Sequence, residues 1–146
     1  MSKSKQAVVA VVVCLFAATV ALAASAHFLK CSKSAQGNNL VVSFKEAGLG
    51  NEVTCISVRA TATANYACIN GGERNPSAAN KRTIVAPTVA SDCFTPHNGS
   101  INGSLTLTPP GPGDFSCPPG QTLVLQSVSY SNVTVNDTTH NVSCTP

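Results

Sequence analysis

Residues 53–69 read VTCISVRATATANYACI, the longest stretch of regular alternation in the chain. Every second residue from Ile56 to Tyr66 is apolar, and the residues between them are Ser, Arg, Thr or Asn. A period of two is typical of a β-strand with one buried and one solvated face. The stretch therefore predicts one long strand, or two continuous ones. Its alanines require a close neighbour, which suits a second sheet with bulky side chains.

Four further segments carry the same alternation: residues 40–45, 83–89, 101–108 and 123–135. Pro87 interrupts the second of these, which suggests an edge strand or a bend, because proline cannot donate to a ladder of hydrogen bonds. In the last segment the apolar phase changes between Tyr130 and Val133. A change of phase without a turn predicts a one-residue bulge, here near Ser131.

Turn-forming residues separate these segments, at 47–51, 70–72, 75–77, 98–100 and 109–113. Several strands divided by Gly, Pro and Asn turns predict an all-β domain, an antiparallel β-sandwich. We expect an immunoglobulin-like arrangement stabilised by disulfides. The chain has no Trp, which excludes the Trp-on-disulfide core of antibody domains.

The N-terminus predicts a secretory signal peptide. Two lysines precede an apolar run from residue 7 to residue 24, and Ala24 and Ala26 form a small-residue cleavage site. Cleavage there makes residues 1–26 the signal peptide and residues 27–146 one secreted domain, beginning at His27; a cut after Ala23 is the alternative. The apolar run is a poor membrane span, because it consists mainly of Ala and Val without a basic flank after it.

Six of the seven cysteines follow the predicted signal peptide, and none forms a CxxC motif. That spacing disfavours zinc sites and thioredoxin-like redox chemistry. An even number in an exported chain favours three structural disulfides, although spacing alone leaves their pairing open. The six are Cys31, Cys55, Cys68, Cys93, Cys117 and Cys144.

Charge is sparse in the predicted mature domain, where seven basic residues face six acidic ones. No basic patch remains to attract nucleic acid or an anionic membrane. Solubility must then come from Ser, Thr, Asn and Gly, and from glycans if the host attaches them. Five N-glycosylation triplets occur in the last third of the chain, at Asn98, Asn102, Asn132, Asn136 and Asn141.

Three segments carry a family resemblance: VVSFKEAGLG at 41–50, NPSAANK at 75–81 and PPGPGDFSCPPGQ at 109–121. They resemble a family of small uncharacterised secreted proteins, mainly actinobacterial. The resemblance implies a secreted β-rich domain and no particular activity. It also implies that Cys68 pairs with Cys117, and it leaves the partners of the other four cysteines open.

A copper site is the most specific functional hypothesis. A histidine at the mature N-terminus offers its amino group and its ring to one copper ion, and a second histidine completes a histidine brace. This arrangement resembles that of lytic polysaccharide monooxygenases and of small exported copper-binding proteins. Nitrogen ligands suit Cu(II). The candidate ligands are His27 with His97 or His140.

Enzymatic motifs are otherwise missing, since the chain has no GxSxG and no HExxH. We therefore expect a non-catalytic extracellular protein without a cofactor, with a binding or structural role and an extracellular protein or glycan as its partner. The copper-binding protein is the alternative. A small hydrolase, with an acid, a His and a Ser in one cleft, is the third hypothesis.

Overall fold

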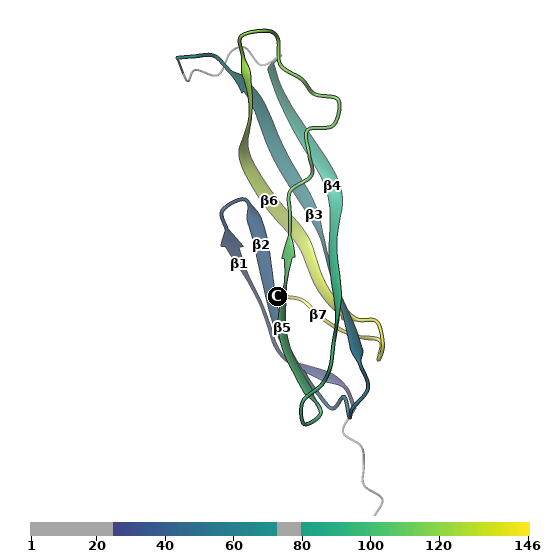
Figure 1. Cartoon of the computed structure of the whole chain (residues 1–146). Coiled ribbons are helices and arrows are strands. Elements are labelled where there is room, and N and C mark those ends of the chain that lie inside the picture. The colour runs from purple at the N-terminus through teal and green to yellow at the C-terminus, as the bar shows by residue number, and fades with distance from the viewer. Residues whose placement is uncertain (1–24, 73–79) are drawn as a thin grey trace, which may run out of the picture.

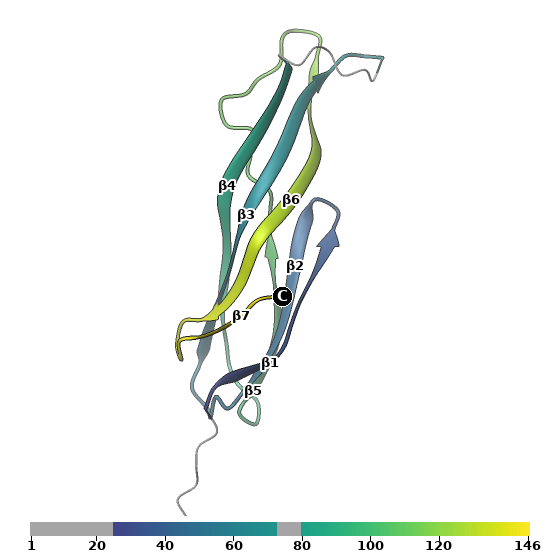
Figure 2. The same ribbon diagram turned by 180° about the vertical axis from the view of Figure 1, so that it is seen from behind.

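The structure, a computed structural model, describes residues 25–72 and 80–146. This part of the chain is all-β, with two antiparallel sheets of strand order β1-β2-β5 and β4-β3-β6-β7 (Figures 1 and 2). The predicted signal peptide up to residue 24 and the turn predicted at 75–77 lie outside the described residues. The strands are β1 (His27–Gln36), β2 (Asn39–Ala47), β3 (Thr54–Ile69), β4 (Lys81–Phe94), β5 (Ser100–Leu107), β6 (Thr122–Asp137) and β7 (Val142–Cys144).

The alternation over residues 53–69 is confirmed, as one continuous strand, β3. Ile56, Val58 and Ala62 on its apolar side are completely buried, whereas Arg59 on the other side is exposed. β3 is an interior strand of the larger sheet because it pairs with β4 along one edge and with β6 along the other. Two flanking strands and one buried face account for the regularity of its sequence.

The bulge expected near Ser131 is present in β6. Arg59 and Thr61, two residues apart in β3, pair with Thr134 and Ser131, three residues apart in β6. Asn132 lies in this stretch with a φ of 53°, a left-handed conformation that asparagine tolerates better than most residues. The extra residue explains why the apolar phase changes without a turn.

The larger sheet extends well beyond the smaller one, because β3 and β6 have 16 residues each and β2 and β5 have 9 and 8. The Tyr130 hydroxyl of β6 donates to the carbonyl of Asn38, in the turn at the upper end of the small sheet (2.8 Å). Above that level the segment 108–121 runs along the large sheet (Figure 1). It is fixed by the hydrogen bond from the Tyr66 hydroxyl to the Pro110 carbonyl (2.7 Å).

The buried alanines therefore have two kinds of neighbour. Ala60 belongs to the core shared by the two sheets, as the sequence predicts. Ala62 and Ala64 are buried too, but at and above the level where the small sheet ends. There a segment rich in Pro and Gly, which has no strand of its own, takes the place of the second sheet.

The main core lies between the lower half of the large sheet and the small sheet. The rings of Phe44 and Phe94 meet edge to face at its margin, with centroids 5.4 Å apart. Gly103 lets them approach, since an added Cβ there would lie 2.8 Å from the Phe94 ring. The core consists of Leu40, Val42, Phe44, Leu49, Ile56, Val58, Ala60, Ile101, Leu107, Val133 and Val135.

Three disulfides connect the six cysteines predicted to be paired. Cys31–Cys144 joins β1 to β7 and so links the two sheets, whereas Cys55–Cys93 joins neighbouring strands of one sheet. Cys68–Cys117, the pair that the resemblance implies, ties β3 to the segment 108–121. Three intramolecular bonds fit an oxidising, extracellular-type compartment. Over residues 25–72 and 80–146 there is no helix of the length and apolarity that a membrane crossing requires.

Candidate binding face

The outward side of the large sheet forms one continuous surface across three strands. Strand register arranges its residues in rows; Arg59, for example, lies between Val89 of β4 and Thr134 of β6. We call this surface the outer face. It consists of Ser57, Arg59, Thr61, Thr63 and Asn65 of β3; Thr83, Val85, Pro87, Val89 and Ser91 of β4; and Ser127, Ser129, Ser131, Thr134 and Asn136 of β6.

Small hydroxyl side chains dominate the outer face, and Arg59 is its one charged residue. Hydrogen bonds order the uppermost row. The Thr83 hydroxyl donates to Asn65 Oδ1 (2.6 Å), and Asn65 Nδ2 donates to the hydroxyl oxygen of Ser127 (2.9 Å). The row thus spans three strands with its side chains fixed in advance of any contact, which lowers the entropy cost of binding.

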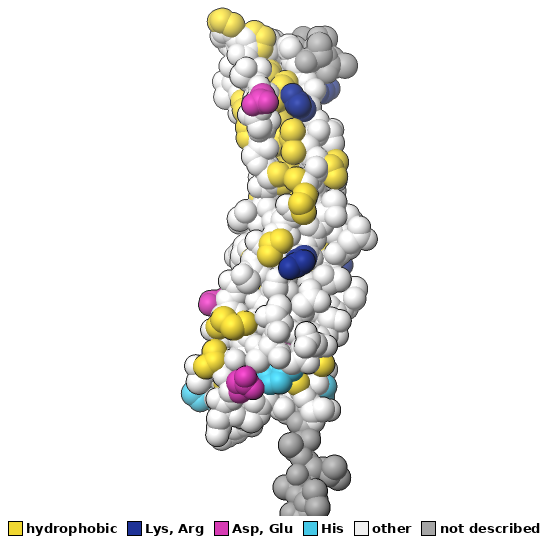
Figure 3. Space-filling model, turned by 90° about the vertical axis from the view of Figure 1, so that its right-hand side faces the viewer, with side chains coloured by type: hydrophobic (Ala, Val, Ile, Leu, Met, Phe, Trp, Pro, Cys, Tyr) yellow, Lys and Arg dark blue, Asp and Glu magenta, His cyan; other side chains and the backbone are white. Residues whose placement is uncertain are grey.

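Two valines on the outer face are more exposed than is usual for their type. Val85 is 62% exposed and Val89 is 56% exposed, and Pro87 lies exposed between them on β4. Figure 3 faces the side on which β4 lies and shows hydrophobic side chains gathered along its upper half. Full burial of one such valine would contribute about 1.5 kcal/mol or more.

The free edge of β4 resists pairing with another strand. Cys55 and Cys93 lie opposite each other with Cα atoms 4.0 Å apart, the spacing of a pair without mutual backbone hydrogen bonds. Val85, Pro87 and Val89 lie an even number of residues from Cys93 and so occupy positions of the same kind. Their backbone polar groups therefore point away from β3, toward the free edge. Pro87 has no N–H to donate in the middle of this edge, which is a common protection of edge strands. A partner would therefore contact side chains of the outer face.

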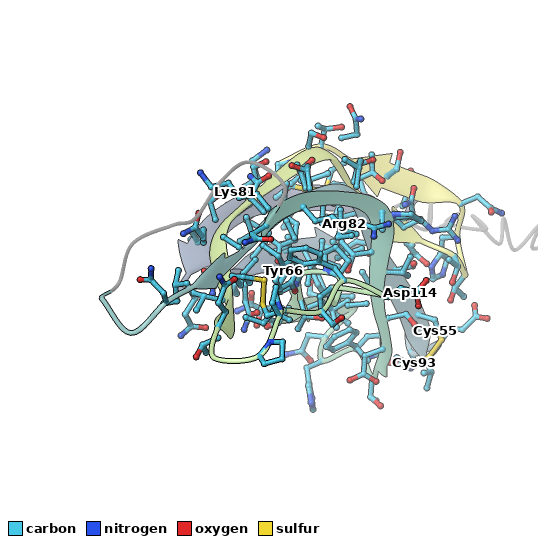
Figure 4. All side chains as sticks on the ribbon, turned by 90° about the horizontal axis from the view of Figure 1, so that it is seen from above. Cys55, Tyr66, Lys81, Arg82, Cys93 and Asp114 are labelled. Carbon is cyan, nitrogen blue, oxygen red and sulfur yellow. A yellow bond between two sulfur atoms is a disulfide. The ribbon has the colours of Figure 1, made fainter. Side chains whose placement is uncertain are left out.

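Two hollows open at the ends of the outer face. The upper one, of about 360 Å³, is lined by Asn65, Lys81 and Arg82 among others, and so combines amide and basic groups. The lower one, of about 540 Å³, lies over Cys55 and Cys93. In Figure 4, which looks down from the upper end, these two cysteines lie at the rim of the molecule.

The three candidate copper ligands lie at the lower end of the sandwich (Figure 3). His27 opens β1, His97 lies in the turn before β5, and His140 lies in the turn between β6 and β7. Within the described ranges no three His, Cys, Asp or Glu side chains are grouped closely enough to hold a metal ion. The ring of His27 contacts the Ser25 carbonyl (2.8 Å). The amino group that a brace requires exists only after cleavage before His27.

A buried pair of acids lies between the sheets at the same end. Glu46 is 0% exposed, and neither of its carboxyl oxygens has a hydrogen-bond partner among the described residues. Burial raises the pKa of Glu46 to about 8, and the neighbouring Asp137 carboxylate adds to this shift. Glu46 is therefore protonated at neutral pH. The sequence contains a signal for this site, since Glu46 continues the buried phase of Leu40, Val42 and Phe44 on β2.

Asp137 has an evident structural task. Its Oδ1 accepts hydrogen bonds from the backbone N–H groups of Thr139 (2.7 Å) and His140 (3.0 Å), and its Oδ2 lies 2.6 Å from His140 Nδ1. The other ring nitrogen of His140 faces Glu52 at 3.8 Å. A hydrolase would need a nucleophile at this histidine. The hydrogen bonds of Asp137 to Thr139 and His140 close the β6–β7 turn, and no hydroxyl or thiol of the described chain is hydrogen-bonded to His140.

The five predicted glycosylation sites occupy accessible positions. Asn98, Asn132 and Asn141 have positive φ angles of 50°, 53° and 58° in turns or at the bulge, and all three are exposed. Asn102 is exposed on β5, and Asn136 is half-buried on the outer face. The position of Asn136 means that a glycan there would cover the lower part of the outer face. Glycosylation itself remains a prediction.

Comparison of the chain with protein-family models, with curated proteins and with solved structures finds no match. The resemblance of the three sequence segments to a secreted family therefore remains a prediction.

Proposed function

We propose that this protein is a non-catalytic, extracellular recognition module that binds a protein partner through its outer face. The observation that carries the proposal is the exposure of Val85 and Val89 on a surface whose uppermost row is ordered by hydrogen bonds. Exposed apolar residues beside polar ones are typical of protein contact surfaces. None of the residues of the outer face is aromatic, and an aromatic ring is the flat apolar surface that suits a sugar. A protein is therefore favoured over a glycan as the partner.

Secretion is part of the same proposal. The signal peptide at residues 1–26 would export the chain, and the three disulfides would form on the way. We also infer an immunoglobulin-like sandwich. The order β1-β2-β5 with β4-β3-β6-β7 differs from that of an immunoglobulin constant domain in one respect, since the fourth strand pairs with the third instead of the fifth.

A pair of double variants tests the outer face. Val85→Asp with Val89→Asp should weaken saturable binding of the labelled mature protein to intact producing cells by roughly a hundredfold, about tenfold for each valine lost from a contact. Leu29→Asp with Val53→Asp is the matched control, because these residues are 56% and 51% exposed but lie off the outer face. The control should bind like the wild type.

The proposal is wrong if wild-type protein shows no saturable binding at micromolar concentration, or if both double variants lose binding equally. Circular dichroism of each variant verifies that the fold is retained. All four positions are exposed, so the substitutions should affect stability little.

A copper protein is the alternative proposal, supported by the common location of the three histidines at the lower end. It predicts that the secreted form begins at His27 and binds one Cu(II) with micromolar or higher affinity, and that His27→Ala abolishes this binding. Intact mass, N-terminal sequence and metal content of one sample decide the matter. A different N-terminus, or no copper uptake, would remove this alternative.

A further inference from the structure

We propose that the Cys55–Cys93 disulfide is a thiol-exchange site. Small extracellular thiols would open this bond and become attached to Cys93 while the domain stays folded. The inference does not depend on the nature of the binding partner. It rests on the access to one bond, on the charge beside it and on the contacts that remain when it opens.

Access separates this disulfide from the other two. Cys93 is exposed, Cys55 is half-buried, and both line the lower hollow of about 540 Å³ on the outer face. Cys68, by contrast, is completely buried. Cys117, Cys31 and Cys144 are half-buried, and the last two pack against the core, so that Cys93 is the one exposed cysteine of the described chain. Exchange requires that a thiolate reach one of the two sulfur atoms, so exposed disulfides are the labile ones.

The charge beside the bond indicates which sulfur is attacked. Asp92 Oδ1 accepts a hydrogen bond from the backbone N–H of Cys93 (2.8 Å), which holds a carboxylate next to that residue. A negative charge there disfavours a thiolate on Cys93. The incoming thiolate therefore forms its new S–S bond with Cys93. The electron pair of the broken bond leaves on Cys55, whose thiolate takes a proton from water, and no oxidant is consumed.

The strands stay in place after the bond opens. Cys55 lies in the β3–β4 ladder between the pairs Thr54–Phe94 and Ile56–Asp92, and its backbone is bound to the β6–β7 turn. Its carbonyl accepts from the Thr138 N–H (2.9 Å) and the Thr138 hydroxyl (3.0 Å), and its N–H donates to the Thr139 hydroxyl (3.0 Å). None of these hydrogen bonds involves a sulfur atom.

Timed exposure of the native, fully oxidised protein to reduced glutathione tests the proposal. Free thiols are trapped by alkylation and each cysteine is followed by peptide mass spectrometry. We expect glutathione on Cys93 and alkylation on Cys55 at least roughly tenfold faster than any change at the other four cysteines. Far-ultraviolet circular dichroism should not change during this phase.

Asp92→Asn provides a second measurement. Removing the carboxylate should accelerate attack by glutathione, which is anionic, about twofold to fivefold. It should have a smaller effect on the rate with 2-mercaptoethanol, whose only charge is that of its thiolate, and the share of the adduct on Cys93 should fall, because the charge that favours attack there is removed. The proposal fails if another disulfide opens first or at the same rate, if the bond opens only together with unfolding, or if Asp92→Asn leaves the glutathione rate unchanged.

Discussion

Glu46→Gln should match the wild type in stability at about pH 5 and exceed it at about pH 9 by on the order of 4 kcal/mol. The folded protein keeps the Glu46 carboxyl protonated up to its pKa of about 8, whereas the unfolded chain releases this proton above 4.5. The folded state thus binds more protons between these values. The free energy of unfolding must fall as pH rises through this range, by at most about 1.4 kcal/mol per unit from this group.

Glutamine keeps the shape of the protonated carboxyl but cannot ionise, so the variant loses this dependence. Denaturant titrations at several pH values, with disulfides intact, measure the difference between the two proteins, in which other titrating groups cancel. Glu52→Gln is the control, because the Glu52 side chain is 70% exposed and lies beside His140, the histidine that also contacts Asp137. Its profile should follow the wild type. Parallel profiles for Glu46→Gln and the wild type would show that Glu46 is ionised in the folded protein.

Features set by neighbouring residues could be predicted from the sequence. Alternation placed β3, and the position of Pro87 within a strand-like segment indicated the edge strand β4. The change of phase located the bulge within one residue of Ser131. In each case the physical cause is local, because the side-chain period of a strand and the missing N–H of proline act wherever the strand lies in the fold.

Two strands gave no usable pattern. β1 has a mostly exposed sequence, with Lys30 and Lys33 on an edge strand, so no buried face imposes alternation on it. β7 has three residues, which is too short for a period to show. Both pair with the strand next to them in the chain, β1 with β2 and β7 with β6, and the bond between Cys31 and Cys144 connects the two across the chain. Long-range closure of this kind leaves little trace in local sequence.

The outer face, too, could be predicted from the sequence only in part. The polar phase of β3 was evident, including Arg59, Thr61 and Thr63, but its neighbours were not. The rows that place Val85 and Val89 beside these residues depend on strand register. Register follows from which strands pair and where, and this is decided by the whole core. Glu46 is a different case, since its buried phase was visible and its chemistry could have been predicted.

The Cys31–Cys144 bond closes the longest loop of the three, with a sequence separation of 113 against 49 and 38. A disulfide stabilises chiefly by restricting the unfolded chain, and the effect grows with loop length. The bond also packs against the core and joins the two sheets through their edge strands β1 and β7. In its own sheet β7 pairs with β6 alone, over three residue pairs.

Replacing Cys31 and Cys144 by alanine should therefore lower the free energy of unfolding by about 5 kcal/mol, whereas the same change at Cys55 and Cys93 should cost about 4 kcal/mol or less. The first variant should also lose residues 142–146 to a carboxypeptidase sooner, because β7 is released. Denaturant titration with the remaining disulfides intact measures both losses. A larger loss from the Cys55 and Cys93 pair would mean that native-state contacts, and not loop closure, determine what each bond contributes, and would contradict a fold that survives opening of the exposed bond.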